Sequence, residues 1–429
     1  MTHTDTILTG TVLTFTGSPF DGAIDATAQL HEAVLIRAGH IHAVGPLTTL
    51  TAQAPDAAIT RHDGCLISAG FVDAHAHYPQ TAIIASWGKR LIDWLNGYTF
   101  PEEQRFDDPV YAAEIANRYL DLTLSNGTTT VASFCTSHPQ SVTAFFEAAQ
   151  ARGLRACAGK TCMDRNAPPA LCDSAQSAYD DSKTLIARWH GLDRLHYVIT
   201  PRFAPTSTPD QLTALGALWA DHPSCLMQTH LSEQIEEIAW VQQLFPKARD
   251  YLDVYEAHGL LGARGLYGHA IHLTPRETAR LSDIGAALIH CPTSNTFIGS
   301  GLFEMGKRTA EGQIIGLATD TGGGSSFSML RSMAAAYEIG QLTGTALHPA
   351  QLIWLATAGS ARALHLQDHI GTIAPGMDAD LVVLDLASTA AIAQRHAQAS
   401  DIWEALFPTI MMGDDRAVKQ VYIAGRPTL

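Results

Sequence analysis

The sequence is poor in charged residues and lacks features that would define several functional classes. Charged residues make up 16% of the 429 residues, the formal net charge is −15, and no cluster of Lys or Arg occurs. Proteins that bind nucleic acid or anionic membranes need basic patches, so neither partner is expected. No apolar run of about 18 residues or more occurs, so no membrane-spanning helix is predicted.

The cysteines lack the spacing of a disulfide framework or a thiolate metal site. There are seven of them, an odd number, and no two stand in a CxxC pattern. The first residues, MTHTDTILTG, contain neither the basic nor the apolar region of a signal peptide. We therefore expect a protein of the reducing cytoplasm, with most cysteines buried as small apolar residues.

Hydrophobic residues, at 46% of the chain, are abundant enough for a large core. Both ends of the chain contain short β-branched runs broken by glycine, which predict strands. The clearest runs are TILTGTVLTF, AVLIRAGHIHAVG, GTIAPGMDADLVVLDL and VKQVYIAGRPTL. Since neither end can close a core alone, we predict that residues 1–67 and 373–429 pair into a small β-sandwich domain.

The middle of the chain, residues 68–372, alternates apolar strands with amphipathic helices. Eight strands are predicted, at GFVDAHAH, GTTTVASF, LRACAGK, LHYVITPRF, CLMQTHLS, GLYGHAIHL, AALIHCPT and IIGLATD. Eight strands with crossover helices are typical of an α/β fold of the (β/α)8 TIM-barrel type. Residues 78–106 are long for one connection, which indicates a functional lid or contact surface rather than a plain loop.

Polar residues recur where the predicted barrel strands end. They are His75, His77, Arg202, His230, His269 and Asp320. The carboxyl ends of barrel strands meet on one face, so side chains far apart in the sequence can converge there.

A metal site is predicted at this face. His75 and His77 stand two positions apart on one strand, so their side chains point the same way. His230 and Asp320 are expected to complete the ligand set, because three imidazoles and one carboxylate suit zinc or iron(II). The alternative of two unrelated histidines is weakened by the polar residues at the other strand ends.

Glu233 and Asp320 are the predicted proton carriers. Glu233 follows His230 by three positions, and Asp320 can take a proton from a metal-activated water. The plain alternative for Glu233 is a carboxylate that favours the start of a helix. His269 is either a further ligand or a group that holds the attacking water and the substrate, and we prefer the second role.

Three residues suit a flat heterocycle. Arg202 offers donors to a carbonyl oxygen, Phe203 can stack on a ring, and Gln80 can both donate and accept. The alternative for Arg202 is a structural ion pair. The glycines of TGGG at 321–324 indicate a tight turn, since the pattern of a phosphate loop is missing.

The remaining histidines receive lesser roles. His290 is expected in either the pocket wall or the core, and His272 is expected to be structural. His31, His40, His42 and His62 fall in the terminal strands and are expected at the surface.

At this point the chain resembles the amidohydrolase superfamily and, within it, the guanine deaminase family. The resemblance rests on FVDAHAHYPQ, LIDWLNGYTFPEE, HPQSV, GKTCMDRNAP, TPRFAPTS, MQTHLSE, YGHAIHL, HCPTSNTFIGSGLF, TDTGGGSSFSML and GDDR, in the family's order. One departure is Ala69, where the family usually carries proline, and it alters a turn rather than the site.

The resemblance implies one zinc per subunit, held by His75, His77, His230 and Asp320. It implies hydrolysis of guanine to xanthine and ammonia in a cytosolic homodimer of purine catabolism. The predicted catalytic residues are Glu233, Asp320 and His269. The predicted substrate-binding residues are Gln80, Arg202, Phe203, His230, Glu233 and His269.

Two rival functions remain. A related deaminase could act on another aminopurine, a pterin or a triazine, and a substrate panel would distinguish it. A non-catalytic scaffold of the same fold is disfavoured because the four proposed ligands and Glu233 are all present.

Overall fold

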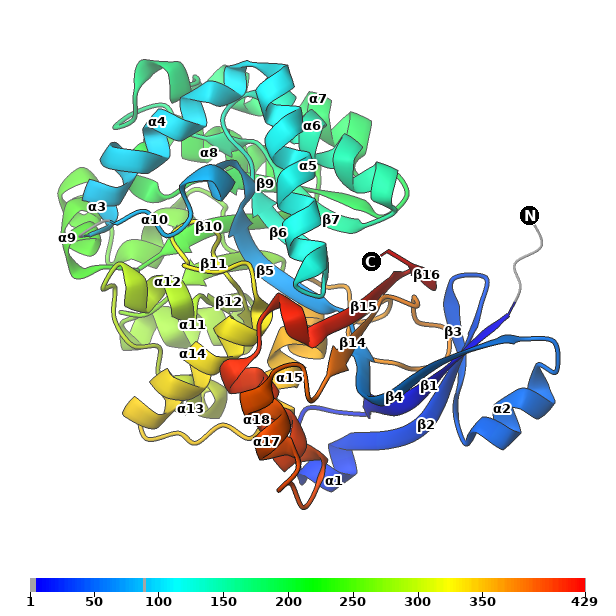
Figure 1. The fold of residues 1–429 in the computed structure, drawn as a ribbon. Coiled ribbons are helices and arrows are strands. Elements are labelled where there is room, and N and C mark those ends of the chain that lie inside the picture. Colours follow the sequence, from blue (N-terminus) through cyan, green and yellow to red (C-terminus); the bar gives the residue numbers. More distant parts are fainter. Residues whose placement is uncertain (1–4, 88–89, 429) are drawn as a thin grey trace.

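The computed structural model describes residues 5–87 and 90–428, which form a barrel and a smaller sheet (Figure 1). The barrel strands in path order are β5 (Phe71–His77), β6 (Thr128–Phe134), β7 (Arg155–Gly159), β9 (Leu195–Pro201), β10 (Leu226–Leu231), β11 (Gly265–His269), β12 (Ala287–His290) and β13 (Ile314–Leu317), with the short β8 (Thr161–Cys162) beside β9. Each of the eight predicted strands contains one of the eight path strands. The predicted (β/α)8 fold is confirmed.

Backbone hydrogen bonds close the barrel between its first and last strands. The Asp320 amide donates to the His75 carbonyl over 2.9 Å, and the His77 amide donates to the Thr321 carbonyl over 2.6 Å. The ends of β5 and β13 are thereby held together, which places His75 and His77 beside Asp320.

The described helices lie around the barrel or beside the smaller sheet, and several follow ordinary start and stop signals (Figure 1). They are α1 (Ile24–Thr27), α2 (Leu47–Gln53), α3 (Leu91–Trp94), α4 (Phe100–Glu103), α5 (Pro109–Ser125), α6 (Pro139–Arg152), α7 (Ala175–Trp189), α8 (Pro209–Asp221), α9 (Ile235–Leu244), α10 (Tyr251–Ala257), α11 (Pro275–Ile284), α12 (Pro292–Phe297), α13 (Met305–Ala310), α14 (Met329–Leu342), α15 (Pro349–Trp354), α16 (Ser360–Ala363), α17 (Ala390–His396) and α18 (Ile402–Met412). The Asp108 side chain caps α5 by accepting from the Val110 amide, and α6 ends at Gly153, whose φ is 66°.

The two ends of the chain form one seven-stranded mixed sheet, in the order β16-β15-β14-β4-β1-β2-β3. Its strands are β1 (Thr6–Phe15), β2 (Ala28–Arg37), β3 (His40–Gly45), β4 (Ala58–Ala69), β14 (Leu381–Asp385), β15 (Val418–Ile423) and β16 (Arg426–Pro427). The C-terminal β14 pairs with the N-terminal β4, so the ends join as predicted (Figure 1). Register shifts in β1 bend the sheet around an apolar cluster of its own.

Three features of the terminal segments differ from the sequence expectations. β4 was not among the predicted strands, because the first half of its run is polar and exposed. Helices α17 and α18, which were not predicted, lie between the two predicted C-terminal strand runs, and Leu406 and Ile410 of α18 join the main core. His62, expected at the surface, is 6% exposed and its Nε2 lies 2.9 Å from the Tyr422 hydroxyl. The domain limits at 67/68 and 372/373 stay predictions.

The segment from 78 to 106 is not a plain loop. It contains a 3₁₀ helix (Tyr78–Ile83), α3, a π-helical turn (Leu95–Thr99), α4 and a second 3₁₀ helix (Gln104–Asp107). Leu95 and Phe100 pack with Met163, Leu171 and Phe203 in a separate apolar cluster. This cluster fixes the segment above the carboxyl ends of the strands.

Two composition-based expectations can be set beside the structure. All seven cysteines are free, and six of them are buried. Within the described ranges, no helix combines the length and the apolar character that a membrane crossing requires.

Candidate functional site

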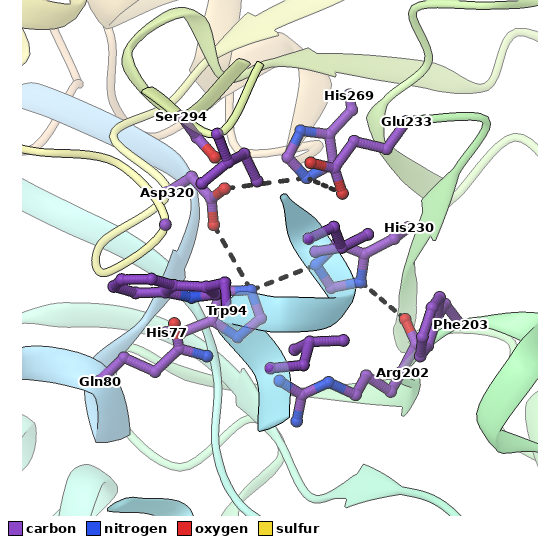
Figure 2. Close-up of a pocket in the computed structure, with 14 residues that line it drawn as sticks. His77, Gln80, Trp94, Arg202, Phe203, His230, Glu233, His269, Ser294 and Asp320 are labelled. Atoms are coloured by element: carbon purple, nitrogen blue, oxygen red, sulfur yellow. Dashed lines mark hydrogen bonds and ion pairs between the residues drawn. The ribbon is translucent and has the colours of Figure 1, made fainter. Parts of the chain in front are cut away.

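The predicted site residues converge on one cavity at the carboxyl ends of the strands. The side chains that line the cavity include His77, His230, Glu233, His269 and Asp320. Figure 2 shows these side chains directed toward a common space, although they come from strands distributed around the barrel. The convergence predicted from the strand ends is therefore present.

Ligand atoms of His75, His77 and His230 lie within 4.8 Å of one another, and Asp320 lies beside two of these histidines. His77 Nε2 lies 3.2 Å from His230 Nε2, and Asp320 Oδ1 lies 3.5 Å from the Nε2 atoms of both His75 and His77. Ligand atoms of a tetrahedral zinc with bonds of about 2.0–2.1 Å are separated by about 3.3 Å. His75 Nε2 is also buried without a hydrogen-bond partner, as a ligand atom would be.

The protonation of the histidines suits metal ligation. His230 Nδ1 lies 2.7 Å from the Arg202 carbonyl oxygen, which can only accept, so Nδ1 carries the proton and Nε2 presents its lone pair. Burial lowers the pKa of His75, and lowers the pKa values of His77 and His230 still further. Neutral imidazole is the form that binds a metal ion.

Asp320 links this group to a second, overlapping group. His75, His269, Cys291 and Asp320 also place ligand atoms within 4.8 Å of one another. Burial raises the pKa of the Cys291 thiol well above its usual value, and its Sγ donates to the Ile289 carbonyl, so Cys291 is a poor ligand. Burial acts to raise the Asp320 pKa, but the nearby His75, His269 and His77 outweigh it and the pKa is lowered.

Glycines make room for the ligands. A Cβ atom at Gly268 would lie 2.8 Å from His75 Cε1, and one at Gly323 would lie 3.0 Å from Ser294 Oγ and 3.3 Å from Asp320 Oδ2. The turn predicted at 321–324 is present, with Gly324 paired back to Thr321. These glycines serve close packing around the site.

Glu233 and His269 lie next to each other on one wall of the cavity (Figure 2). His269 Nε2 lies 3.5 Å from Glu233 Oε2 and 3.8 Å from Asp320 Oδ2, while Nδ1 lies 2.8 Å from Asn295 Oδ1. Glu233 Oε1 accepts from the Ser300 hydroxyl over 2.7 Å, so Oε2 is the oxygen left for the cavity. Burial raises the pKa of Glu233, and the anionic Asp320 adds to this although His269 opposes it.

The turn that carries Glu233 is held by a second buried carboxylate. Glu237 accepts from the backbone amides of Glu233 and Gln234 over 3.0 and 3.1 Å, and from the Tyr251 hydroxyl over 2.7 Å. Ser232 at this turn has a φ of 49°, in the left-handed region that disfavours residues with a side chain. The predicted helix-start role is thus performed by Glu237, and Glu233 is free to face the cavity.

Arg202 forms the structural ion pair that was its alternative role, and its predicted contact with substrate stays a prediction. It lines the cavity and also forms a buried ion pair with Glu103, with Nη1 2.6 Å from Oε2 and Nη2 3.1 Å from Oε1. The Gln80 amide nitrogen donates to the same Glu103 Oε1 over 3.0 Å. Gln80 and Phe203 line the cavity as predicted.

Several residues of the site carry no role in the sequence predictions. Trp94 is 2% exposed and lines the cavity from the 78–106 segment (Figure 2). Asp73, within the FVDAHAH motif, accepts from the backbone amides of His75 and Thr319 and so joins β5 to the residue before Asp320. Glu103 ends the motif LIDWLNGYTFPEE, but nothing in the spacing of the motif indicates which donors its carboxylate meets.

Two further histidines resolve as structural. His290 stacks on Phe303 with ring centroids 4.5 Å apart, and burial lowers its pKa to about 3. His272 Nε2 lies 2.8 Å from the Ser300 carbonyl oxygen. Neither residue lines the cavity.

Comparison with known proteins gives one family match over most of the chain. The profile described as Amidohydrolase family matches residues 66–428, and a profile described as an imidazolonepropionase-like composite domain of bacteria matches residues 33–57. The guanine deaminase of Escherichia coli (strain K12) is 43% identical over 394 residues, covering 92% of this chain and 90% of the relative.

Solved structures give the same grouping. The chain superposes on E. coli guanine deaminase with a TM-score of 0.96 at 40% identity, covering 99% of both chains. A guanine deaminase from C. acetobutylicum, solved with guanine bound in its active site, gives a TM-score of 0.89 at 28% identity, covering 99% of this chain and 100% of the other. A zinc-bound adenosine deaminase from Xanthomonas campestris, at 22% identity and a TM-score of 0.85, shares the fold.

Proposed function

The chain belongs to the amidohydrolase family, and from this premise we propose that it is a guanine deaminase, an enzyme that hydrolyses guanine to xanthine and ammonia. One observation carries the proposal. A buried cavity joins a set of metal-ligand atoms to Glu233 on one side and to the donors of Arg202 and Gln80 on the other. Deamination needs both an activated water and a ring held by its edge.

We propose that His75, His77, His230 and Asp320 hold one zinc ion. The ligand-atom spacing and the neutral imidazoles fit such an ion, and iron(II) accepts the same donors. When bound, it would lower the pKa of a coordinated water to about 7 and so supply a nucleophile at neutral pH.

The remaining residues bind and orient the substrate. Arg202 donates to the carbonyl oxygen of guanine, and Phe203 and Trp94 offer ring faces to the purine from the cavity wall. His230 lines the cavity and would also be one of the residues that hold the metal ion. The amino-bearing carbon thereby comes to lie between Asp320 and Glu233.

Protons move between two carboxylates. Asp320 takes the proton of the attacking water as oxygen adds to the amino-bearing carbon. Glu233, whose raised pKa favours carrying a proton, donates it to the adjacent ring nitrogen. The proton held by Asp320 then passes to the amine, which leaves as ammonia, and Glu233 takes back a proton from the added hydroxyl as the new carbonyl forms. His269 holds the attacking water and the developing oxygen by its Nε2 face. The carbon–nitrogen bond breaks and xanthine remains.

Ammonia release from guanine, measured with and without a chelator, tests the proposal. We expect release that stops on chelation and returns when zinc is added. The panel includes another aminopurine, a pterin and an aminotriazine. If guanine is inert and one of these compounds is turned over, that compound class replaces guanine as the substrate. A purified protein that has neither metal nor turnover would favour a scaffold function.

We further propose a cytoplasmic homodimer that acts in purine catabolism. The seven free cysteines suit a reducing compartment, and the resemblance to guanine deaminases supports the dimer. Light scattering of the purified protein tests the dimer, and fractionation of cells tests the compartment.

A further inference from the structure

Glu103 stands behind the substrate-facing wall of the cavity. It is 1% exposed and is reached by three donors: two guanidinium nitrogens of Arg202 and the amide nitrogen of Gln80. The first two contacts form a parallel fork on the carboxylate, the geometry that fixes an arginine plane most firmly. Both residues that meet the purine edge are therefore held by one side chain that does not line the cavity itself.

This contact also decides which end of the Gln80 amide faces the substrate. A carboxylate paired with a guanidinium has only acceptors to offer, so Gln80 must turn its NH₂ group toward it. The amide oxygen Oε1 accepts no hydrogen bond from the described residues, and Figure 2 shows it directed away from Arg202. The cavity wall therefore presents a donor from Arg202 next to an acceptor from Gln80.

We propose that Glu103 is a positioning residue that makes this wall specific for the lactam edge of an oxopurine. The inference rests on the proposed guanine deaminase function. In guanine, the C6 carbonyl is an acceptor and the neighbouring N1–H is a donor, so the edge matches Arg202 and Gln80 Oε1 in that order. The amidine edge of a 6-aminopurine carries a donor, the 6-amino group, followed by an acceptor, N1. The donor would face the donor of Arg202, and the acceptor would face the acceptor Gln80 Oε1.

Packing around α4 holds Glu103 in place. It closes α4, and Phe100 at the start of this helix packs with Leu95, Met163 and Phe203. The Arg202 guanidinium lies 5.6 Å from the centre of the Phe100 ring. The 78–106 segment thus brings an apolar anchor and an anion to the same arginine.

The test compares two substrates that share the leaving amine at C2 and differ at the edge. Guanine has the lactam edge, and 2,6-diaminopurine has the amidine edge. In the Glu103→Gln variant, the new amide can donate as well as accept. The Gln80 amide can then flip and present its NH₂ group to the cavity instead of Oε1. We expect the ratio of kcat/KM for guanine to that for 2,6-diaminopurine to fall about tenfold or more. The KM for guanine should rise more than kcat falls, and metal content should be unchanged.

Glu102→Gln is the matched control, because Glu102 is the adjacent buried carboxylate and its partners are Arg105 and Tyr111. It should keep the wild-type ratio. Gln80→Met is the second variant should Glu103→Gln fold poorly, since it removes Oε1 and leaves the ion pair. Where turnover of 2,6-diaminopurine is too slow, its inhibition constant is measured instead.

The outcomes distinguish failure of the proposed function from failure of the proposed role of Glu103. If the wild-type protein releases no ammonia from guanine, the proposed function fails. If it does, but Glu103→Gln loses both substrates in equal proportion, or Gln80→Met keeps the wild-type ratio, Glu103 is only structural and the inference is overturned.

Discussion

At the scale of single residues, the site is ordered by which atom of each polar group already has a partner. His230 uses Nδ1 on a carbonyl and keeps Nε2, Glu233 uses Oε1 on Ser300 and keeps Oε2, and Gln80 uses Nε2 on Glu103 and keeps Oε1. In each case the atom without this partner faces the cavity. Since a buried polar atom seldom stays unpaired, each of these atoms is expected to meet a bound group.

Glu233→Gln should keep the metal and lose turnover. The amide is nearly isosteric and Ser300 can still donate to its oxygen, but it can no longer carry a proton to the ring. We expect kcat to fall by about 10²–10⁴-fold, the usual contribution of general acid–base catalysis. Ammonia release and metal analysis measure both properties. Glu236→Gln, on an exposed neighbour, is the control, and normal turnover in Glu233→Gln would refute the proton role.

Gly268→Ala should weaken metal binding without touching a ligand. Its Cβ would lie 2.8 Å from His75 Cε1, closer than such contacts occur, so the imidazole must turn away. We expect about a tenfold or greater loss of metal affinity, measured by competition with a chelator. Gly17→Ala, whose Cβ meets its nearest atom at 3.6 Å, is the matched control. Equal affinities for the two variants would show that His75 is not fixed by this contact.

At the scale of elements, the turn between β10 and α9 carries a large share of the site. It follows His230, includes Glu233, and is held by Glu237 at the first turn of α9. The left-handed Ser232 is tolerated because these hydrogen bonds outweigh its cost of about 1–3 kcal/mol. An element end with so many fixed contacts keeps Glu233 at a constant distance from the ligands.

Glu237→Gln should change how stability depends on pH. Burial, together with the nearby Glu233, raises the pKa of Glu237 to about 7. Above pH 4.5 the unfolded chain releases this proton while the folded chain keeps it, so the folded state loses stability as pH rises toward 7. The variant lacks this loss, so its melting temperature should gain on the wild type between pH 5 and 7. A difference in melting temperature that is constant with pH would contradict the argument.

The segment from 78 to 106 shows how far element prediction reached. Its length predicted a functional lid or contact surface; Gln80 and Trp94 both line the cavity, and the functional role itself stays a prediction. Its short helices were not expected, since no 3.6-residue apolar period runs through them and their order comes from packing on Met163, Leu171 and Phe203. Likewise β4 lacks an alternating pattern in its exposed half and forms by pairing with β1 and β14.

At the scale of the molecule, the proposed metal site lies across the closure of the barrel. His75 and His77 end the first strand and Asp320 follows the last, and Asp73 ties the same two ends together through the Thr319 amide. A metal ion held by residues from both ends would stabilise the closed barrel, because it would bind the folded chain and not the unfolded one.

Metal removal should therefore lower stability as well as activity. We expect the chelated protein to melt about 5 °C or more below the zinc-loaded protein. Scanning calorimetry of the two forms measures the shift. His230→Ala should show a much smaller response to chelator because it has lost a ligand. If the wild type melts at one temperature in both forms, the site does not bridge the closure.

The sequence by itself determined the barrel, the pairing of the two chain ends and the positions of the polar strand ends. These depend on local apolar periods and on the rule that parallel strands place their carboxyl ends on one face. It also determined the family, because long motifs agree in order along the chain. Only the tertiary structure decided which donor meets which acceptor. Glu103 and Asp73 find their partners through packing between elements far apart in the sequence, and no spacing along the chain encodes such a contact.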